Sequence, residues 1–121
     1  MAALREAGDA TMHEHPGARV VVLSDYEFVY ELRGKESPPG DGHAGLLETS
    51  RMIALAPETV GPERPVGEYR HSPFVPGTPT AQDWPESVIG DTRPASRELG
   101  EKVQGYVLDR LVETVRTLLP A

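Results

Sequence analysis

The side chains best suited to chemistry gather in one short stretch, residues 41–50, which reads DGHAGLLETS. Glycines on either side of His43 let the backbone turn sharply and approach a ligand closely, and Glu48 follows in the first turn of an expected helix. One interpretation is structural: the helix dipole stabilises an acid at this position by about 0.3–1 kcal/mol, beside a solvated histidine. In the other, apolar neighbours bury Glu48, which then needs a cation because an unpaired buried carboxylate is costly. Spacing alone leaves both open.

Other ligand-type side chains are scattered along the chain. There is no cysteine, which excludes a disulfide scaffold, a thiolate zinc site and a cysteine nucleophile, so any metal would need His, Asp or Glu ligands. His13 and His15 lie at the end of an expected helix, and His71 lies among prolines. None has a partner at a recognisable spacing. A small metal site built on His13 and His15 is therefore the weakest of the functional hypotheses.

Five stretches of the chain are expected to form the elements that position these residues. Their bounds are predicted from the spacing of hydrophobic residues and from the glycines and prolines that end helices and strands. They are a short helix (1–16), a buried strand (18–31), the His/Glu loop and a largely buried helix (40–60), a proline-rich crossing (61–90) and a C-terminal helix (94–119). The crossing has room only for short strands such as residues 69–75. A helix followed by a buried strand is half of a parallel β/α unit, and too few strands follow for a free-standing α/β domain, so the sheet looks incomplete.

Two aromatic residues lie toward the end of the expected strand. Open α/β sheets bind ligands beyond the carboxyl ends of their strands, so Tyr26 and Phe28 are candidates to line a substrate pocket. Aromatic residues at a strand end are also common core residues, and the sequence does not decide between these roles. Asp41 and Gly42 are further candidates for substrate contact because they precede His43 in the same loop.

Composition narrows the classes of partner. The chain has 121 residues and a net charge of -7, which argues against nucleic acid and anionic membranes as partners. Its longest apolar run is far shorter than the ~20 residues that a membrane span needs, and the N-terminus lacks a signal-peptide pattern. We therefore expect a cytoplasmic protein whose ligand is a small molecule.

Two motifs resemble those of one enzyme family. Residues 41–60, DGHAGLLETSRMIALAPETV, resemble the His-Ala/Gly-Gly-x-x-Glu-Thr-Ser segment and following helix of the creatininase (creatinine amidohydrolase) family. Residues 87–100, SVIGDTRPASRELG, are similar to the Gly-Asp-Pro-x-x-Ala-Ser junction that precedes the C-terminal helix of that family, with Thr92 in place of the proline. Together the motifs cover most of residues 40–119 in the expected order.

The resemblance implies a fold, a chemistry and roles for two residues. It implies an α/β/α fold with a mainly parallel sheet, and hydrolysis of an amide-type bond at a two-metal site that commonly holds zinc or manganese. Glu48 matches the glutamate that ligates one metal, and His43 matches the histidine that shuttles protons. Such a site can lower the pKa of a shared water, while a histidine beside it returns the proton to the leaving nitrogen.

The chain also departs from the family pattern. The family places its other metal ligands on a Glu-x-His pair with a following aspartate and on an Asn-Gly-His-Gly-x-Asn loop, and neither is found in this sequence. We therefore expect the C-terminal part of a creatininase-like protein that is inactive alone. Its expected partner is either a further copy of the chain in a homo-oligomer, because the family forms multimers, or a complementary N-terminal segment. The alternative is a non-catalytic, truncated remnant or assembly module.

The substrate is not specified by the sequence. The family includes creatinine hydrolases, deformylases of a formamidopyrimidine nucleotide and peptidases that trim a cofactor precursor. Creatinine recognition relies on tryptophans near the histidine loop, whereas the only tryptophan here is Trp84, so the sequence favours a deformylase-like or uncharacterised amidohydrolase. Arg33, Lys35 and Arg51 could contact a phosphate, although a solvated surface role is the simpler interpretation.

Overall fold

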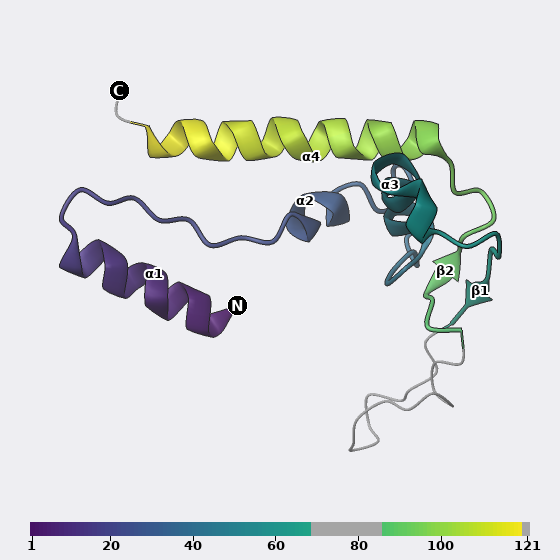
Figure 1. Cartoon of the computed structure of the whole chain (residues 1–121), viewed down its shortest axis with the longest axis horizontal. Coiled ribbons are helices and arrows are strands. Elements are labelled where there is room, and N and C mark those ends of the chain that lie inside the picture. Colours follow the sequence, from purple (N-terminus) through teal and green to yellow (C-terminus); the bar gives the residue numbers. More distant parts are fainter. Residues whose placement is uncertain (69–85, 120–121) are drawn as a thin grey trace, which may run out of the picture.

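The computed structural model describes residues 1–68 and 86–119, and Figure 1 shows the arrangement of its elements. In chain order they are α1 (Ala2–Glu14), α2 (Tyr26–Tyr30), α3 (Leu46–Leu55), the 3-10 helix η1 (Pro57–Thr59), β1 (Val66–Gly67), β2 (Gly90–Asp91) and α4 (Arg97–Leu118). The long helices lie where hydrophobic spacing predicts them. Within the described ranges, none of the helices combines the length and apolarity needed to cross a membrane.

The contact between α3 and α4 organises the body of the molecule. The two helices approach so closely at Gly100 that a Cβ atom there would overlap the backbone carbonyl of Ser50. The Ser50 hydroxyl accepts a hydrogen bond from the backbone N–H of Ser96 at 3.2 Å, and the Ser96 hydroxyl in turn caps α4 by accepting from Leu99 N–H at 3.1 Å. Small and hydroxyl side chains therefore fix where α4 begins against α3.

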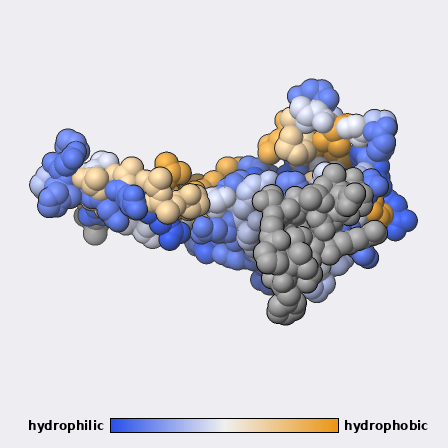
Figure 2. All heavy atoms as spheres, turned by 90° about the horizontal axis from the view of Figure 1, so that it is seen from below, coloured by the Kyte–Doolittle hydropathy of each residue, from blue (hydrophilic) through white to orange (hydrophobic). Residues whose placement is uncertain are grey.

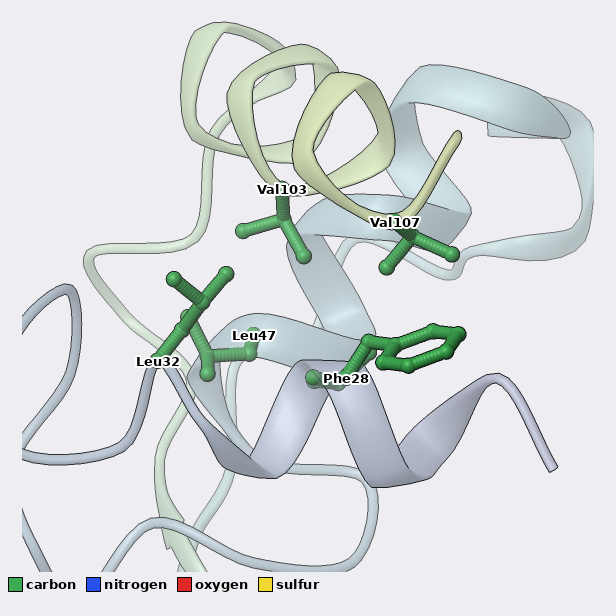
Figure 3. Packing of buried hydrophobic residues seen from close by; sticks show 6 residues of the cluster. Phe28, Leu32, Leu47, Val103 and Val107 are labelled. Carbon is green, nitrogen blue, oxygen red and sulfur yellow. The ribbon is translucent and has the colours of Figure 1, made fainter. Parts of the chain in front are cut away.

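A compact hydrophobic core lies between α2, α3 and α4, and Figure 3 shows its side chains converging from these helices. Its buried members are Phe28, Val29, Leu32, Leu47, Val103 and Val107. The prediction that the helix after the His/Glu loop is largely buried is only partly right: Leu47 is buried, but Met52 is 42% exposed and Leu55 57% exposed. One face of α3 therefore remains open to solvent.

The expected buried strand over residues 18–31 is not formed. Residues 18–24 are extended but carry no strand assignment, and Tyr26–Tyr30 form the short helix α2. Val21 is 44% exposed rather than buried on both faces. The physical reason is that a strand exists only when a second strand satisfies its backbone hydrogen bonds, and the described residues provide none beside this segment.

The described residues contain one two-stranded sheet. β1 pairs with β2 in antiparallel register, with Val66 opposite Asp91 and Gly67 opposite Gly90. The mainly parallel sheet expected from the sequence is therefore not seen in this part of the molecule. The short strand expected at residues 69–75 lies outside the described ranges, as do His71 and Trp84.

Candidate functional site

The His/Glu loop is fastened to the segment that leads into β2. Gly42 N–H donates to the carbonyl of Ile89 at 2.8 Å, and Ile89 N–H donates to the carbonyl of His43 at 2.8 Å. This reciprocal pair brings the stretches 41–50 and 87–100, which carry the two sequence motifs, side by side. The loop before α3 is therefore positioned by tertiary hydrogen bonds as well as by its own turn.

Gly42 and Gly45 allow the loop to pack closely against Ile89 and Asp41. A Cβ atom on Gly42 would lie 2.9 Å from the Ile89 side chain, and one on Gly45 would overlap the carboxylate of Asp41. Ala44 has a φ of 48°, in the left-handed region that L-residues rarely adopt. Strain of this kind persists only where the surroundings impose it, and here it lies directly beside His43. Substrate contact by Gly42 stays a prediction.

Asp41 has a structural task at the N-terminus of α3. Its side chain is buried, and its two carboxylate oxygens accept hydrogen bonds from Leu46 N–H at 2.6 Å and Leu47 N–H at 3.1 Å. These are two of the backbone donors that have no partner within the helix. The negative charge also lies at the positive end of the helix dipole. Substrate contact by Asp41 stays a prediction, and this cap accounts for the residue without it.

Glu48 occupies the first turn of α3 and is half-buried. One of its carboxylate oxygens accepts a hydrogen bond from Ala44 N–H at 2.8 Å, which closes the loop back onto the helix. No ion pair of Glu48 is found within residues 1–68 and 86–119. The expectation that burial forces Glu48 to pair with a cation is thus not met by this part of the chain.

A pocket of about 280 Å³ lies beside Glu48. Its walls come from α2, the loop before α3, α3 itself, η1 and the chain after η1, and include Tyr26, Ala44, Glu48, Thr49, Met52, Thr59, Val60 and Gly61. It joins one carboxylate, one phenol and two threonines to apolar side chains, the composition expected of a small-ligand site. The structure therefore brings Tyr26 and Glu48 together in one pocket. His43 is exposed and is not part of its wall but directly precedes the wall residue Ala44 in the sequence.

Phe28 does not share this pocket. It belongs to the hydrophobic core, 9% exposed, and the Arg110 guanidinium lies 5.3 Å from its ring centroid. Tyr26 and Phe28 are two residues apart in a helix, where such neighbours point to nearly opposite sides, so one faces the pocket and the other the core. Phe28 is therefore a core residue in the described part of the chain and not part of this pocket, because the expected strand is a helix. For Tyr26, substrate contact stays a prediction.

The electrostatic surroundings keep Tyr26 protonated. Partial burial raises the pKa of its hydroxyl, the Glu48 carboxylate adds to that rise, and the Arg51 guanidinium opposes it. A phenol with a raised pKa remains a hydrogen-bond donor throughout the neutral range. The pocket thus presents a donor from Tyr26 and an acceptor from Glu48.

Arg51 is the residue of this region that sequence reasoning misjudged. It is buried, 9% exposed, and its guanidinium donates to Asp25 at 2.6 Å and to Gln104 at 3.0 and 3.2 Å. It also lies 5.7 Å from the Tyr26 ring centroid. A solvated surface role is therefore wrong for Arg51, and a phosphate contact stays a prediction. Its position between apolar residues of α3 was the available signal that it needs a buried partner.

The remaining candidate cations and histidines lie away from the pocket. The Arg33 guanidinium stacks 4.0 Å from the Tyr30 ring centroid, and Lys35 is exposed. His13 and His15 are exposed at the end of α1. Across the described ranges, no group of three or more His, Asp or Glu side chains is arranged to hold a metal ion.

Comparison with known proteins decides the family. The sequence model described as creatininase, creatinine amidohydrolase, matches residues 1–115, nearly the whole chain. The chain belongs to the creatininase family. The match extends well before residue 40, so the similarity to creatininases covers α1 and the extended segment as well as the two motifs.

Solved creatininase structures share the fold. A manganese creatininase aligns with a TM-score of 0.70, and a Zn-Zn type creatininase mutant and a tryptophan-to-phenylalanine creatininase mutant align with 0.69. Each is 27% identical and covers 99% of this chain but only 49% of the other. The chain thus spans about half the length of the creatininase structures that it matches. No curated protein sequence gives a significant match.

The departure at Thr92 from the second creatininase motif has a structural explanation. Thr92 is buried, and its hydroxyl and its backbone N–H both donate to the carbonyl of Pro65, at 2.7 and 3.2 Å. Proline, which the motif has at this position, carries neither donor. Thr92 therefore ties the chain after β2 to the chain before β1 by contacts that proline cannot make.

Proposed function

We propose that the chain contributes one part of the active site of a creatininase-like amidohydrolase, which cleaves a C–N bond of a small-molecule amide. The observation that carries this proposal is the pocket in which Tyr26 and Glu48 meet beside the His43 loop, in a chain that matches the creatininase family along nearly its whole length. The matched structures are named as zinc and manganese enzymes, which supports a divalent metal in the family.

The described residues do not by themselves fit a two-metal centre. Each divalent ion at a catalytic site generally takes three or more protein ligands, and this part of the chain offers the Glu48 carboxylate and the neighbouring His43. We therefore propose that Glu48 supplies one ligand, and that the others come from polypeptide outside this chain. The isolated chain is accordingly expected to have negligible metal-dependent activity.

The chemistry proposed for this chain's own residues is proton transfer and orientation. Hydrolysis forms a bond between water oxygen and the carbonyl carbon, breaks the C–N bond and requires a proton on the leaving nitrogen. We assign that proton transfer to His43, which is exposed beside the pocket wall. The protonated Tyr26 is placed to donate a hydrogen bond to the substrate from the same pocket. Creatinine, a formamidopyrimidine nucleotide and a cofactor-precursor peptide are the substrate classes to compare.

The experiment reconstitutes the site from two polypeptides. The chain is mixed with a separately produced polypeptide that comprises the part of the manganese creatininase outside the match, and bound zinc or manganese and hydrolysis are measured for each component and for the mixture. Activity is expected only in the mixture. Metal-dependent hydrolysis by the isolated chain would contradict the shared site.

Two substitutions separate the assigned roles. Glu48→Gln is expected to abolish activity in the mixture and to reduce bound metal, whereas His43→Ala is expected to abolish activity while bound metal is retained. Glu98→Gln is the matched control, because Glu98 is an exposed acid in the first turn of α4. If Glu48→Gln changes only the free energy of unfolding, Glu48 is a structural residue and the catalytic proposal is wrong.

A second candidate function is a non-catalytic assembly module. It is favoured by exposed apolar side chains on α4 and in the N-terminal region. Figure 2 shows hydrophobic surface along the arm that contains α1. An inactive mixture that nevertheless forms a stable complex, unaffected by Glu48→Gln, would support this function over the enzyme.

A further inference from the structure

The Arg51 guanidinium joins three parts of the fold at one point. From α3, it donates to the carboxylate of Asp25 at the start of α2 at 2.6 Å, and to the side-chain oxygen of Gln104 on α4 at 3.0 and 3.2 Å. The Arg51 side chain is 11% exposed and that of Asp25 is 38% exposed. A buried guanidinium depends on such partners because an unpaired buried charge is costly. Arg51 therefore links the start of α2 to both α3 and α4.

Asp25 uses its carboxylate for this contact and not for a helix cap. Aspartate at an N-cap position commonly accepts a hydrogen bond from a backbone N–H of the first helical turn. Asp25 is the N-cap residue of α2, yet its side chain makes no such bond. The N–H of the next residue, Tyr26, donates instead to the hydroxyl of Ser24 at 3.4 Å. The carboxylate of Asp25 is thus committed to the contact with α3.

Tyr26 lies at the end of α2 that this contact holds. α2 has five residues, and a helix this short is unstable in water without tertiary packing. Its other side is anchored by Phe28 in the hydrophobic core, where Figure 3 shows the ring near Val107 of α4. Within the described residues, the side-chain hydrogen bond that joins the start of α2 to α3 is that of Asp25 with Arg51. The contact that holds this side of α2 is thus made one residue before Tyr26.

Arg51 contacts Tyr26 from outside the pocket. Its guanidinium lies 5.7 Å from the Tyr26 ring centroid, within the range of a cation–π interaction. The walls of the pocket include Tyr26 and, from α3, Glu48, Thr49 and Met52, but not Arg51. A residue behind the wall acts on the geometry of a ligand through the wall residues that it contacts. For the Arg51 guanidinium, that wall residue is Tyr26.

We propose that Arg51 is a positioning residue, which holds Tyr26 in the pocket beside Glu48 by binding Asp25 at the start of α2. That Tyr26 meets a substrate rests on the proposed function, whereas the position of its ring does not. Loss of the Arg51 contact frees the first turn of α2, while Phe28 keeps the opposite side packed in the core. The Tyr26 ring then turns out of the pocket, and a reacting substrate loses a hydrogen-bond donor of fixed direction.

The first test uses the isolated chain and no substrate. Nuclear Overhauser contacts between the Tyr26 ring and the methyl groups of the pocket wall are measured by NMR. Arg51→Met keeps an unbranched apolar stem and removes the guanidinium, so these contacts are expected to weaken several-fold while those of Phe28 with the hydrophobic core persist. Lys102→Met is the matched control, because it removes the 2.6 Å ion pair of Lys102 with Glu36, outside the pocket wall, and should leave the Tyr26 contacts unchanged.

A second variant removes the same contact from its other partner. Asp25→Ala leaves Arg51 bound to Gln104 and takes away no side-chain cap, because Asp25 makes none. It should keep the helix content of the original chain by circular dichroism and release the Tyr26 ring as Arg51→Met does. Unchanged contacts of the Tyr26 ring in a folded Arg51→Met or Asp25→Ala chain would overturn the proposal.

The second test uses the two-polypeptide mixture and asks whether Arg51 acts through Tyr26. Arg51→Met is expected to lower kcat/KM about tenfold or more, but only within about twofold when Tyr26→Phe has already removed the hydroxyl. Arg51→Lys keeps the charge but lacks the planar fork that reaches two partners at once, so it should behave as Arg51→Met does. Lys102→Met, which changes an exposed ion pair, should stay within about twofold of the original chain.

Two outcomes of the second test count against the proposal. Equal losses for Arg51→Met with and without Tyr26→Phe would mean that Arg51 acts on the substrate by another route. A loss confined to the formamidopyrimidine nucleotide and restored by Arg51→Lys would make Arg51 a phosphate contact. An inactive mixture containing the original chain, in contrast, would count against the proposed function, while the NMR measurements still decide the position of Tyr26.

Discussion

At the scale of single residues, carboxylates near the pocket have distinct tasks. Asp41 is buried and caps α3 through two backbone N–H groups, whereas Glu48 is half-buried and accepts one such bond at the pocket wall. The loop motif therefore contains one acid whose two carboxylate oxygens are both used to cap α3, and one that accepts a single backbone hydrogen bond at the pocket wall.

Removal of the Asp41 cap should destabilise the fold. Asp41→Ala leaves the N–H groups of Leu46 and Leu47 without their acceptor in a buried position, so the free energy of unfolding is expected to fall by about 1–3 kcal/mol. Urea denaturation followed by circular dichroism measures the change. Asp109→Ala, at an exposed position on α4, is the control and should stay within about 0.5 kcal/mol. Equal effects of the two changes would mean that the cap contributes little.

Asp91 at the end of β2 should titrate at unusually low pH. Hydrogen bonds from the Arg93 side chain and backbone lower the pKa of Asp91 from 3.8 to about 2. The stabilising contribution of this pair is present above pH 3.8 and is lost as the pH falls through about 2. Arg93→Ala should raise the pKa of Asp91 toward 3.8, measured by NMR titration of its carboxyl carbon. Arg97→Ala, which affects a different ion pair, should leave that pKa unchanged.

At the scale of elements, the crossing of α3 and α4 depends on one glycine. Gly100 lies against the backbone of Ser50, whereas Gly105, one and a half turns further along the same helix, has open space around it. The same substitution should therefore have opposite effects at the two positions. This pair of glycines separates the cost of steric overlap from the general effect of glycine in a helix.

Gly100→Ala is expected to lower the free energy of unfolding by about 1–3 kcal/mol, because the added methyl group pushes α4 away from α3. Gly105→Ala should raise it by about 0.4–1 kcal/mol, since alanine restricts the unfolded chain and favours the helix. Chemical denaturation of both variants measures the difference. A stabilising effect of Gly100→Ala would show that α3 and α4 are less tightly packed than described.

At the scale of the whole molecule, the N-terminal region is joined to the rest by few polar contacts. Among the described residues, Arg19 provides the hydrogen bonds between the extended segment and the end of α4. The hydrophobic core lies elsewhere, between α2, α3 and α4 (Figure 3). The N-terminal region is therefore expected to open more readily than the body of the molecule.

Arg19→Met should loosen this region without unfolding the core. The variant keeps an apolar stem but leaves the last carbonyls of α4 without the guanidinium, so amides of α1 should exchange several-fold faster while those of α3 stay protected. Hydrogen exchange read by mass spectrometry measures both regions in one experiment. Arg97→Met, at the other end of α4, is the control. Unchanged exchange in α1 would mean that apolar contacts alone hold the region.

The sequence by itself determined the features that depend on neighbours along the chain. The helices at Ala2–Glu14, Leu46–Leu55 and Arg97–Leu118 follow from apolar spacing, and the two motifs point to the family that the comparisons establish. Their signals are local, because a helix closes its hydrogen bonds within four residues. The loop that carries His43 and leads to Glu48 is also recognisable from neighbouring residues, because its glycines and the helix that follows lie within residues 41–50.

Only the tertiary structure decided the roles that depend on distant partners. The run Val20 to Leu23 reads as a buried strand, yet it stays unpaired because a strand needs a neighbouring strand that the described residues do not provide. Arg51 is buried because Asp25 and Gln104, far from it in sequence, meet it in space. Tyr26 meets Glu48 for the same reason. Local periodicity encodes helices, whereas strand pairing and buried ion pairs exist only once remote segments come together.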